Sequence, residues 1–166
     1  MSKNIIFDLD LTLVDSTIAE SARSQRNWPL TYSLIPKFTL YDGIEEVFDF
    51  IRSNNIKVCI VSTAPRAYVE KVVKHFNIPC SCIIGYHDAK PIKPDSAPML
   101  KALELMNEPA SNVISFGDRV IDIQASNAAN VESVACFWGS KEKEALLSSS
   151  YKYAAYNPNE IIGLIQ

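Results

Sequence analysis

NIIFDLDLTLVDS, residues 4–16, is the stretch of sequence that decides the fold. Its first apolar run, Ile5 to Phe7, has the composition of a buried strand and leads directly into Asp8 and Asp10. Alternate residues of a strand share a face, so both carboxylates can project toward one pocket where the strand ends. Two neighbouring acids repel each other, which predicts a positive partner here, and Mg²⁺ prefers such hard oxygen ligands.

Composition limits the classes of protein to which the chain can belong. Its 166 residues are 48% hydrophobic and 21% charged, as expected of one compact domain over residues 1–166. A net charge of −3 gives no general attraction to nucleic acid or to anionic lipid. No apolar run approaches the roughly 18 residues of a membrane span. We therefore expect a cytoplasmic protein that binds neither nucleic acid nor membrane.

The four cysteines are expected to be reduced thiols, because no export signal is recognisable in the sequence. Cys80 and Cys82, flanked by His75 and His87, could in principle form a tetrahedral zinc site. The spacing argues against it, since alternate residues leading into the apolar run CIIGY should point to opposite faces of a strand. Packing is the favoured interpretation of these cysteines.

Short apolar runs alternate with stretches of helical period along the whole chain. The runs predict strands at 5–7, 58–61, 82–84, 113–116 and 134–138. Apolar residues spaced three and four apart predict helices at 44–51, 69–76, 99–106, 121–129 and 161–165. Apolar strands separated by crossover helices predict an α/β fold: a Rossmann-like, doubly wound parallel sheet with helices on both faces.

Polar residues follow three further strands, where the same pocket should lie. Ser62 ends the second strand, and its hydroxyl can donate a hydrogen bond to a phosphate oxygen. Lys90 and Lys93 come after the third strand, and Asp118 and Asp122 come after the fourth. Because ligands of an open parallel sheet collect beyond the carboxyl ends of its strands, we expect these side chains to surround one site.

Four short motifs therefore stand at successive strand ends, in an order that is typical of one known family. As they occur here, the motifs are Asp8, Asp10 and Thr12 of DLDLT; Ser62; Lys93 and Pro94 ahead of a helix; and Gly117, Asp118 and Asp122 of GDRVID. Each motif alone is weak, whereas four in this order are specific. The sequence resembles the haloacid dehalogenase superfamily, among its phosphoglycolate-phosphatase-like hydrolases, over nearly its whole length.

The resemblance implies a Mg²⁺-dependent phosphatase that hydrolyses a phosphate monoester through an aspartyl-phosphate. By this resemblance Asp8 is the nucleophile, and Asp10 is the general acid and base. The Asp8 carboxylate, the main-chain carbonyl of Asp10 and Asp118 would hold the metal. Asp122 would orient water or neighbouring groups without binding the ion directly.

The same resemblance implies which residues bind the substrate phosphate. Ser62 and Lys93 would hold the phosphoryl oxygens, and Lys93 would also offset the negative charge around Asp8. Thr12 is placed with them as the residue that ties the loop into position. Lys90 remains an alternative to Lys93, because a lysine can reach a phosphate from several backbone positions.

Two other functions stay open on the sequence alone. In the family that the sequence resembles, dehalogenases and phosphonate-cleaving members usually lack an acid at the position of Asp10, because their leaving groups do not need the same proton, so the resemblance disfavours these activities. A sugar-phosphate mutase would keep this acid. A regulatory domain that uses Asp8 only as a phosphoacceptor, resembling response-regulator receivers, would hold its phosphate without turnover.

Residues 16–40 are a short insert at the position where members of this superfamily carry a cap. The insert is small, so we expect an open site that is closed only by this segment or by a partner subunit of a homo-oligomer. The substrate would be a phosphorylated small molecule or an exposed phosphoester. Arg23, Arg26 and Trp28 could bind an anionic or planar substrate, although packing of Trp28 against the core is the favoured interpretation.

Overall fold

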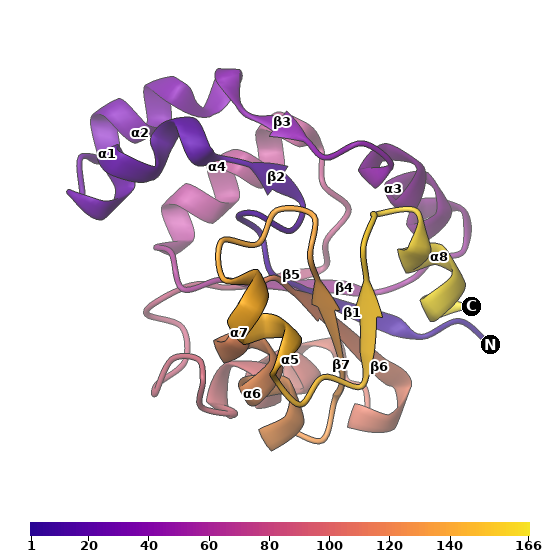
Figure 1. Ribbon diagram of the computed structural model, residues 1–166. Coiled ribbons are helices and arrows are strands. Elements are labelled where there is room, and N and C mark those ends of the chain that lie inside the picture. The colour runs from indigo at the N-terminus through magenta and orange to yellow at the C-terminus, as the bar shows by residue number, and fades with distance from the viewer.

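A six-stranded parallel sheet in the order β5-β4-β1-β6-β7-β8 forms the centre of the computed structural model, which describes residues 1–166 (Figure 1). Its strands are β1 (Asn4–Phe7), β4 (Val58–Val61), β5 (Cys82–Ile84), β6 (Val113–Gly117), β7 (Glu132–Cys136) and β8 (Tyr153–Ala155). A small antiparallel sheet joins β2 (Val14–Asp15) to β3 (Thr39–Leu40). The predicted α/β fold with a parallel sheet is confirmed.

Helices cover both faces of the large sheet (Figure 1). One face carries α3 (Ile44–Ser53), α4 (Arg66–Phe76) and α8 (Glu160–Ile165), and the other carries α5 (Ala97–Met106) and α6 (Val120–Ala128). The shorter helices are α1 (Glu20–Ser24), α2 (Trp28–Leu34) and α7 (Lys143–Leu147). Single 3₁₀ turns occur at Thr17–Ala19, Ile35–Lys37 and Ala110–Asn112.

The central strand β1 divides its side chains between two hydrophobic cores. Ile5 and Phe7 pack with α3, α4 and α8 in the larger core, whereas Ile6 packs with α5 and α6 in the smaller one. All three side chains are buried, because both faces of the sheet are covered. This arrangement explains why β1 is a continuous apolar run rather than an alternation of apolar and polar residues.

The order of the strands reverses between β1 and β6. From β1 the chain builds outward through β4 and β5 on one side, and from β6 it builds outward through β7 and β8 on the other. The main-chain N–H of Asp8 still donates to the carbonyl of Phe116, at 3.0 Å, so the pairing continues one residue past β1. Such a point of reversal is where a doubly wound sheet binds ligands.

Helix α4 follows β4 in the chain and places the side chain of Tyr68 in the larger core. Pro65 precedes the helix, where its missing N–H costs nothing, and Asn77 ends it in the left-handed conformation with φ 50°. Tyr68, Val69 and Val72 form its buried face. Tyr68 thus lies in the first turn of α4, with its ring inside the larger core.

The structure adds elements that the sequence pattern did not predict. Strand β8 extends the sheet beyond β7, and α7 lies between these two strands in the chain. The strand expected at 134–138 occurs two residues earlier, at Glu132–Cys136. Phe137 and Trp138 therefore belong to the loop at the carboxyl end of β7, near the site. Their apolar character had made the strand look longer.

The insert of residues 16–40 folds into α1, α2 and 3₁₀ turns, and it lies over α4 at one end of the molecule (Figure 1). Ile35 and Phe38 are buried in the larger core, and Trp28 packs against it. Arg23 and Arg26 flank a groove that is described below. The insert therefore includes both packing residues and residues beside a cavity.

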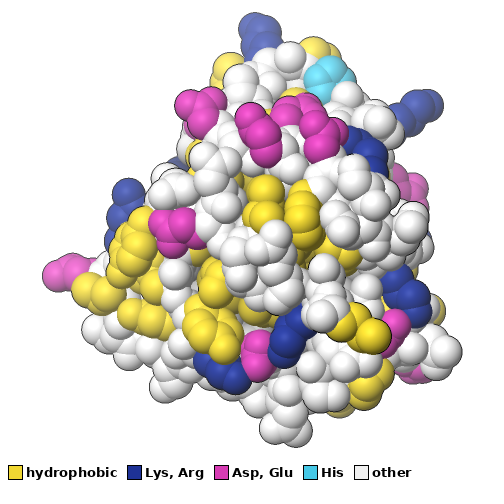
Figure 2. Space-filling view, turned by 90° about the vertical axis from the view of Figure 1, so that its right-hand side faces the viewer, with side chains coloured by type: hydrophobic (Ala, Val, Ile, Leu, Met, Phe, Trp, Pro, Cys, Tyr) yellow, Lys and Arg dark blue, Asp and Glu magenta, His cyan; other side chains and the backbone are white.

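None of the helices has the length and apolar character needed to cross a membrane. Figure 2 shows the face that carries α3 and α8, where hydrophobic side chains are exposed among polar and charged ones. The two ends of the chain lie close together on this side of the molecule (Figure 1), and the main-chain N–H of Lys3 donates to the carbonyl of Ile165 at 2.8 Å.

Candidate active site

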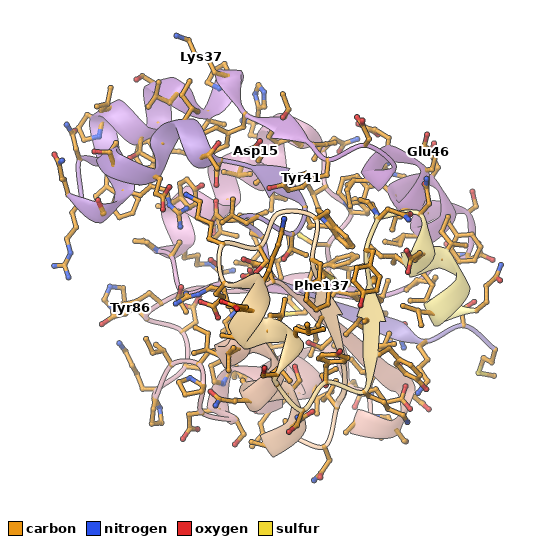
Figure 3. All side chains as sticks on the ribbon, in the orientation of Figure 1. Asp15, Lys37, Tyr41, Glu46, Tyr86 and Phe137 are labelled. Atoms are coloured by element: carbon orange, nitrogen blue, oxygen red, sulfur yellow. The ribbon has the colours of Figure 1, made fainter.

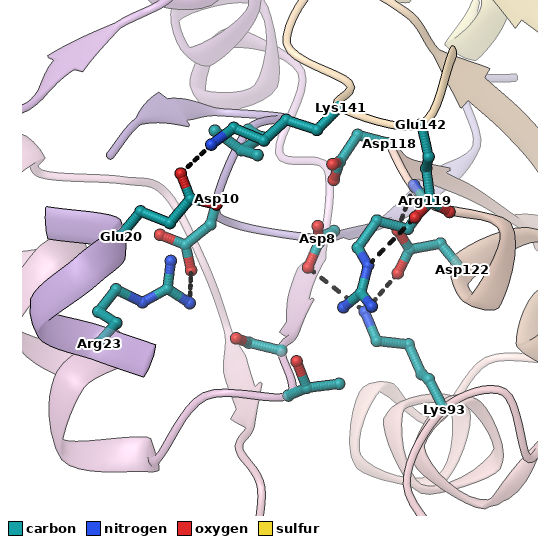
Figure 4. Close-up of a pocket in the computed structure, with 13 residues that line it drawn as sticks. Asp8, Asp10, Glu20, Arg23, Lys93, Asp118, Arg119, Asp122, Lys141 and Glu142 are labelled. Carbon is teal, nitrogen blue, oxygen red and sulfur yellow. Dashed lines mark hydrogen bonds and ion pairs between the residues drawn. The ribbon is translucent and has the colours of Figure 1, made fainter. Parts of the chain in front are cut away.

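A polar cavity of about 300 Å³ opens at the carboxyl ends of β1, β4 and β6 (Figure 4). Of the residues that the sequence predicted for the site, most line this cavity: Asp8, Asp10, Ser62, Lys93, Asp118 and Asp122. Residues from four separate strand ends and from the insert are thereby brought together. The cavity wall has one hydrophobic residue, Leu11.

Lys93 is a buried cation held by acceptors on three sides. Its Nζ lies 3.3 Å from Asp8 Oδ1, 2.5 Å from Asp122 Oδ1 and 3.0 Å from the carbonyl of Val61. The side chain is 3% exposed. Burial opposes its charge, but Asp122 and Asp8 outweigh burial and raise the pKa of Lys93 above its ordinary value. Lys93 is therefore a permanent positive charge beside Asp8.

Lys93 also sets the charge of the carboxylates around it. Burial favours the protonated form of Asp8, but the positive charge of Lys93 and the hydrogen bonds to Asp8 together outweigh burial and lower the pKa of Asp8 below its usual value. Asp122 behaves differently: burial and the negative charge of Asp8 raise its pKa to about 6, although Lys93 opposes the shift. Asp8 therefore ionises more readily than Asp122, and a carboxyl group must be ionised to act as a nucleophile.

Asp118 lies against Asp8, where its ionised form is strongly unfavourable. Burial and the negative charge of Asp8 raise the pKa of Asp118 to about 10. Its Oδ1 accepts a hydrogen bond from Thr12 Oγ1 at 3.0 Å. Thr12 is fully buried and does not line the cavity, so the structure places it as a support for Asp118 rather than in contact with a substrate phosphate.

Three clustered acidic side chains, two of them paired with Lys93, form a set of donors that fits a divalent cation. Ligand oxygens of Asp8, Asp118 and Asp122 all lie within 4.8 Å of one another. Lys93 neutralises one negative charge, which leaves an excess of negative charge in a buried place. Oxygen donors of this kind suit Mg²⁺. Burial and the negative charge of Asp8 raise the pKa of Asp118, and a cation bound here would favour its ionised form.

Asp10 points away from Asp8 and toward the insert (Figure 4). Its Oδ1 accepts hydrogen bonds from Ser16 Oγ and from Tyr68 Oη, each at 2.6 Å, and its Oδ2 lies 3.1 Å from Arg23 Nη2. The side chain is 12% exposed. The carboxyl group is therefore held on three sides while one edge still borders the cavity.

Ser62 ends β4 with its hydroxyl at the cavity. Its Oγ accepts a hydrogen bond from the main-chain N–H of Ala64 at 3.0 Å, which leaves the hydroxyl proton free to donate. Of the two candidate lysines, Lys93 lies in the cavity. Lys90 instead lies over the ring of Tyr86, 3.6 Å from its centroid, on the surface.

Four charged residues of the cavity wall were not predicted: Glu20, Arg119, Lys141 and Glu142. Lys141 forms an ion pair with Glu20 across the mouth of the cavity (Figure 4). Glu142 Oε1 accepts from the main-chain N–H of Val120 at 2.6 Å. The signal that could have found Lys141 and Glu142 is their position, since they follow β7 at the carboxyl edge of the sheet.

A wider groove of about 720 Å³ adjoins the polar cavity and shares Glu20, Arg23 and Thr63 with it. The insert forms one wall of this groove, and the loop that follows β5 forms the other. Tyr86 of that loop lies below the insert helices in Figure 3. The cavity is thus open on the side of the insert.

Gly117 makes the close packing of this site possible, because a Cβ at this position would lie 2.6 Å from Asp122 Oδ2. We expect Gly117→Ala to displace Asp122 and to lower the free energy of unfolding by about 1–3 kcal/mol. Urea denaturation measures this loss. Gly163→Ala is the matched control, because nothing lies within 4 Å of the added Cβ. Equal denaturation midpoints for Gly117→Ala and the wild type would contradict the close contact.

The sequence profile of one family, described as haloacid dehalogenase-like hydrolase, matches residues 30–136, which is more than half of the chain. The chain belongs to this family. The matched range includes the second, third and fourth motifs and begins after Asp8 and Asp10. These two acids stand at the cavity on the evidence of their positions in the structure.

Two curated proteins are similar in sequence to this chain over most of its length. A pyrophosphatase PpaX of Oceanobacillus iheyensis is 29% identical over 128 residues, which cover 76% of this chain and 58% of the relative. A phosphoglycolate phosphatase of Pseudomonas syringae pv. tomato is 27% identical over 135 residues, which cover 80% of this chain and 49% of the relative. The chain thus spans about half the length of the curated relatives it matches.

Solved structures share the fold of this family member at lower sequence identity. A predicted phosphoglycolate phosphatase from Haemophilus somnus has a TM-score of 0.86 and 18% identity, covering 99% of this chain and 98% of that one. A haloacid dehalogenase-like family protein from Streptococcus pneumoniae has a TM-score of 0.81 and 20% identity, covering 99% of both chains. At these identities the likeness supports the fold alone.

Proposed function

We propose that this protein is a Mg²⁺-dependent phosphatase that hydrolyses a phosphate monoester through an aspartyl-phosphate on Asp8. The observation that carries the proposal is the ionised Asp8 at the end of β1, paired with the buried Lys93 and facing a polar cavity. Family membership and relatives described as phosphatases and pyrophosphatases support this reaction class.

In the first step, an Asp8 carboxylate oxygen attacks phosphorus and the bond from phosphorus to the leaving oxygen breaks. Asp10, which starts this step protonated, gives its proton to the leaving oxygen, which departs as an alcohol. In the second step, water attacks phosphorus, Asp10 takes a proton from it, and the bond from Asp8 to phosphorus breaks. Inorganic phosphate leaves, and both carboxyl groups return to their starting states.

Neighbouring groups stabilise the charge on the transferred phosphoryl group. Ser62 lies at the cavity with a free hydroxyl proton, and Lys93 supplies a fixed positive charge beside the point of attack. Asp122 holds Lys93 in place, and its Oδ2 accepts from the main-chain N–H of Arg119 at 3.0 Å. Asp122 is therefore a positioning residue in this proposal.

Asp8, Asp118 and the main-chain carbonyl of Asp10 would hold the metal, with Asp122 close to them. When bound, the ion would offset the negative charge of phosphate and carboxylates in one place. The donor set fits this ion, because the oxygens of three acidic side chains lie close together and only two of these side chains, Asp8 and Asp122, are paired with the buried Lys93. Thr12 would keep Asp118 in position through its hydrogen bond.

Phosphate release is expected to depend on added Mg²⁺. Removing the ion with excess chelator should lower turnover by about 10²-fold or more, because three buried carboxylates would then repel the anionic substrate. Ca²⁺ should suppress the activity, since it takes more ligands at longer distances than Mg²⁺. A titration of both ions against an aryl phosphate measures this. Undiminished turnover in chelator would reject the metal requirement.

A panel of phosphate esters tests the proposed function directly. Sugar phosphates, nucleotides, phosphorylated small acids, pyrophosphate and phosphopeptides are incubated with Mg²⁺, and released phosphate is measured. Repeated release from one class supports a phosphatase. Transfer of phosphate between positions of a sugar would indicate a mutase. A stable phosphoprotein without turnover would indicate a phosphoacceptor domain.

The open groove bears on substrate size and on assembly. Because the insert leaves the cavity connected to a groove of about 720 Å³, bulky phosphoesters should not be excluded sterically. Tight selectivity for a very small substrate would then require closure by a second copy of the chain. Sedimentation beside the substrate panel tests this. A strict monomer that accepts one very small ester would contradict it.

A further inference from the structure

Tyr68 is a fully buried residue whose hydroxyl reaches the active site. Its side chain belongs to the larger hydrophobic core and is 0% exposed. Its Oη donates to Asp10 Oδ1 at 2.6 Å, the shorter end of the range for such bonds. A phenol keeps its proton at neutral pH, so Tyr68 is the donor and the Asp10 carboxyl oxygen is the acceptor.

The three partners of the Asp10 carboxyl group, Ser16, Arg23 and Tyr68, differ in how they constrain its orientation. Ser16 lies six residues from Asp10 in the same segment, so its hydrogen bond shapes the loop locally. Arg23 contributes an ion pair at 3.1 Å, and its buried Nε has no hydrogen-bond partner. Tyr68 comes from α4 and makes the directed hydrogen bond that ties Asp10 to the core of the fold.

The ring of Tyr68 also joins Asp10 to the insert. The guanidinium of Arg23 lies 4.9 Å from the centre of the Tyr68 ring. The same guanidinium forms the ion pair with Asp10. The ring of Trp28 lies 6.0 Å from that of Tyr68, at an interplanar angle of 45°. Two helices of the insert therefore rest on the residue that holds Asp10.

We propose that Tyr68 is a positioning residue for the reaction: its hydroxyl fixes the direction of the Asp10 carboxyl group, and its ring couples that direction to the insert. The inference rests on the proposed function of Asp10 as acid and base. Loss of the hydroxyl leaves the ring in the core but lets the carboxyl group turn. Steps that need proton transfer by Asp10 should then suffer, whereas phosphate binding should not.

Tyr68→Phe is the test, because it removes the hydroxyl and keeps the ring contacts with Arg23 and Trp28. We expect kcat for an alkyl phosphate to fall about 10- to 100-fold with KM unchanged within about twofold. With 4-nitrophenyl phosphate, whose leaving group needs little protonation, attack continues while hydrolysis of the intermediate slows. Phosphoenzyme should therefore accumulate from the aryl ester in a rapid acid quench, and not from the alkyl ester.

Tyr32→Phe is the matched control, since Tyr32 lies in the same aromatic group, 6.2 Å from Trp28 between ring centres, without contact to Asp10. It should behave as the wild type. Equal losses for both esters in Tyr68→Phe, without accumulation of phosphoenzyme, would show a general structural role and overturn the inference. So would unchanged kinetics in Tyr68→Phe.

A second measurement keeps the inference separate from the proposed function. If the wild-type protein hydrolyses no ester, the phosphatase proposal fails, and the ¹³C resonance of the Asp10 carboxyl group decides the role of Tyr68. A change of that resonance in Tyr68→Phe but not in Tyr32→Phe supports the positioning role. An unchanged resonance in both variants rejects it. Circular dichroism and thermal unfolding check that the variants are folded.

Discussion

Asp8→Ala is expected to abolish phosphate release, lowering turnover by about 10⁴-fold or more, because no neighbouring group can form the missing bond to phosphorus. Phosphoenzyme should also disappear when the protein is mixed with a radiolabelled phosphate donor and quenched in acid. At the same time the free energy of unfolding should not fall. After burial, the negative charge of Asp8 is the main cause that raises the pKa of Asp118 to about 10, so the change relieves Asp118, and Lys93 keeps Asp122 as its partner.

Asp15→Ala provides the matched control for this result. Asp15 belongs to the same segment as Asp8, but its Oδ1 accepts from the N–H and the hydroxyl of Thr17 and does not line the cavity. Turnover in this variant should stay close to the wild-type value. Normal turnover in Asp8→Ala, or a phosphoenzyme that persists there, would mean that another residue is the nucleophile.

The combination of lost activity and retained stability distinguishes a functional residue from a structural one. Asp8 sits in a place that is unfavourable for three acids, and the fold tolerates this because Lys93 offsets part of the charge. Removal of a packing residue such as Phe7, by contrast, should lower stability by about 3–5 kcal/mol and activity only as a consequence. Measuring both quantities for one variant thus separates the two roles.

The sheet was predictable wherever a strand is covered on both faces. β1, β4 and β6 are largely apolar because their side chains enter both cores, and their positions were predicted within one residue. β8 is three residues long, Tyr-Ala-Ala, and its tyrosine is exposed. This edge strand is held by its hydrogen bonds to β7. Because main-chain hydrogen bonds place no demand on side-chain type, the sequence of β8 carries no apolar pattern from which the strand could be predicted.

The sequence predicted which types of residue form the site, but it did not predict all of the contacts that these residues make. Acids and a lysine at strand ends predicted a charged pocket, and the structure brings Asp8, Lys93 and Asp118 together. Thr12 was expected among the phosphate-binding residues, yet it is buried beneath Asp118. Tyr68 was not expected at all, because a tyrosine on the buried face of a helix is indistinguishable in sequence from an ordinary core residue.

Lys93→Met is expected to have a large effect on both stability and turnover. Methionine retains much of the length of the side chain, but Asp8 and Asp122 then lose their shared partner in a buried place. Breaking a buried ion pair by removing one member typically costs about 3–5 kcal/mol, because the remaining charge is left uncompensated. We expect a loss of this size in the free energy of unfolding, measured by urea denaturation, together with a fall in turnover of about 10²–10³-fold.

Lys90→Met is the matched control, because Lys90 lies on the surface above Tyr86 and outside the cavity. Its effect on stability should stay within about 0.5 kcal/mol. The double variant Lys93→Met with Asp122→Asn isolates the cause, since it removes the second carboxylate along with its partner. If uncompensated charge is what destabilises Lys93→Met, the double variant should recover part of the lost stability without recovering turnover. A double variant no more stable than Lys93→Met would instead assign the loss to packing around the lysine chain.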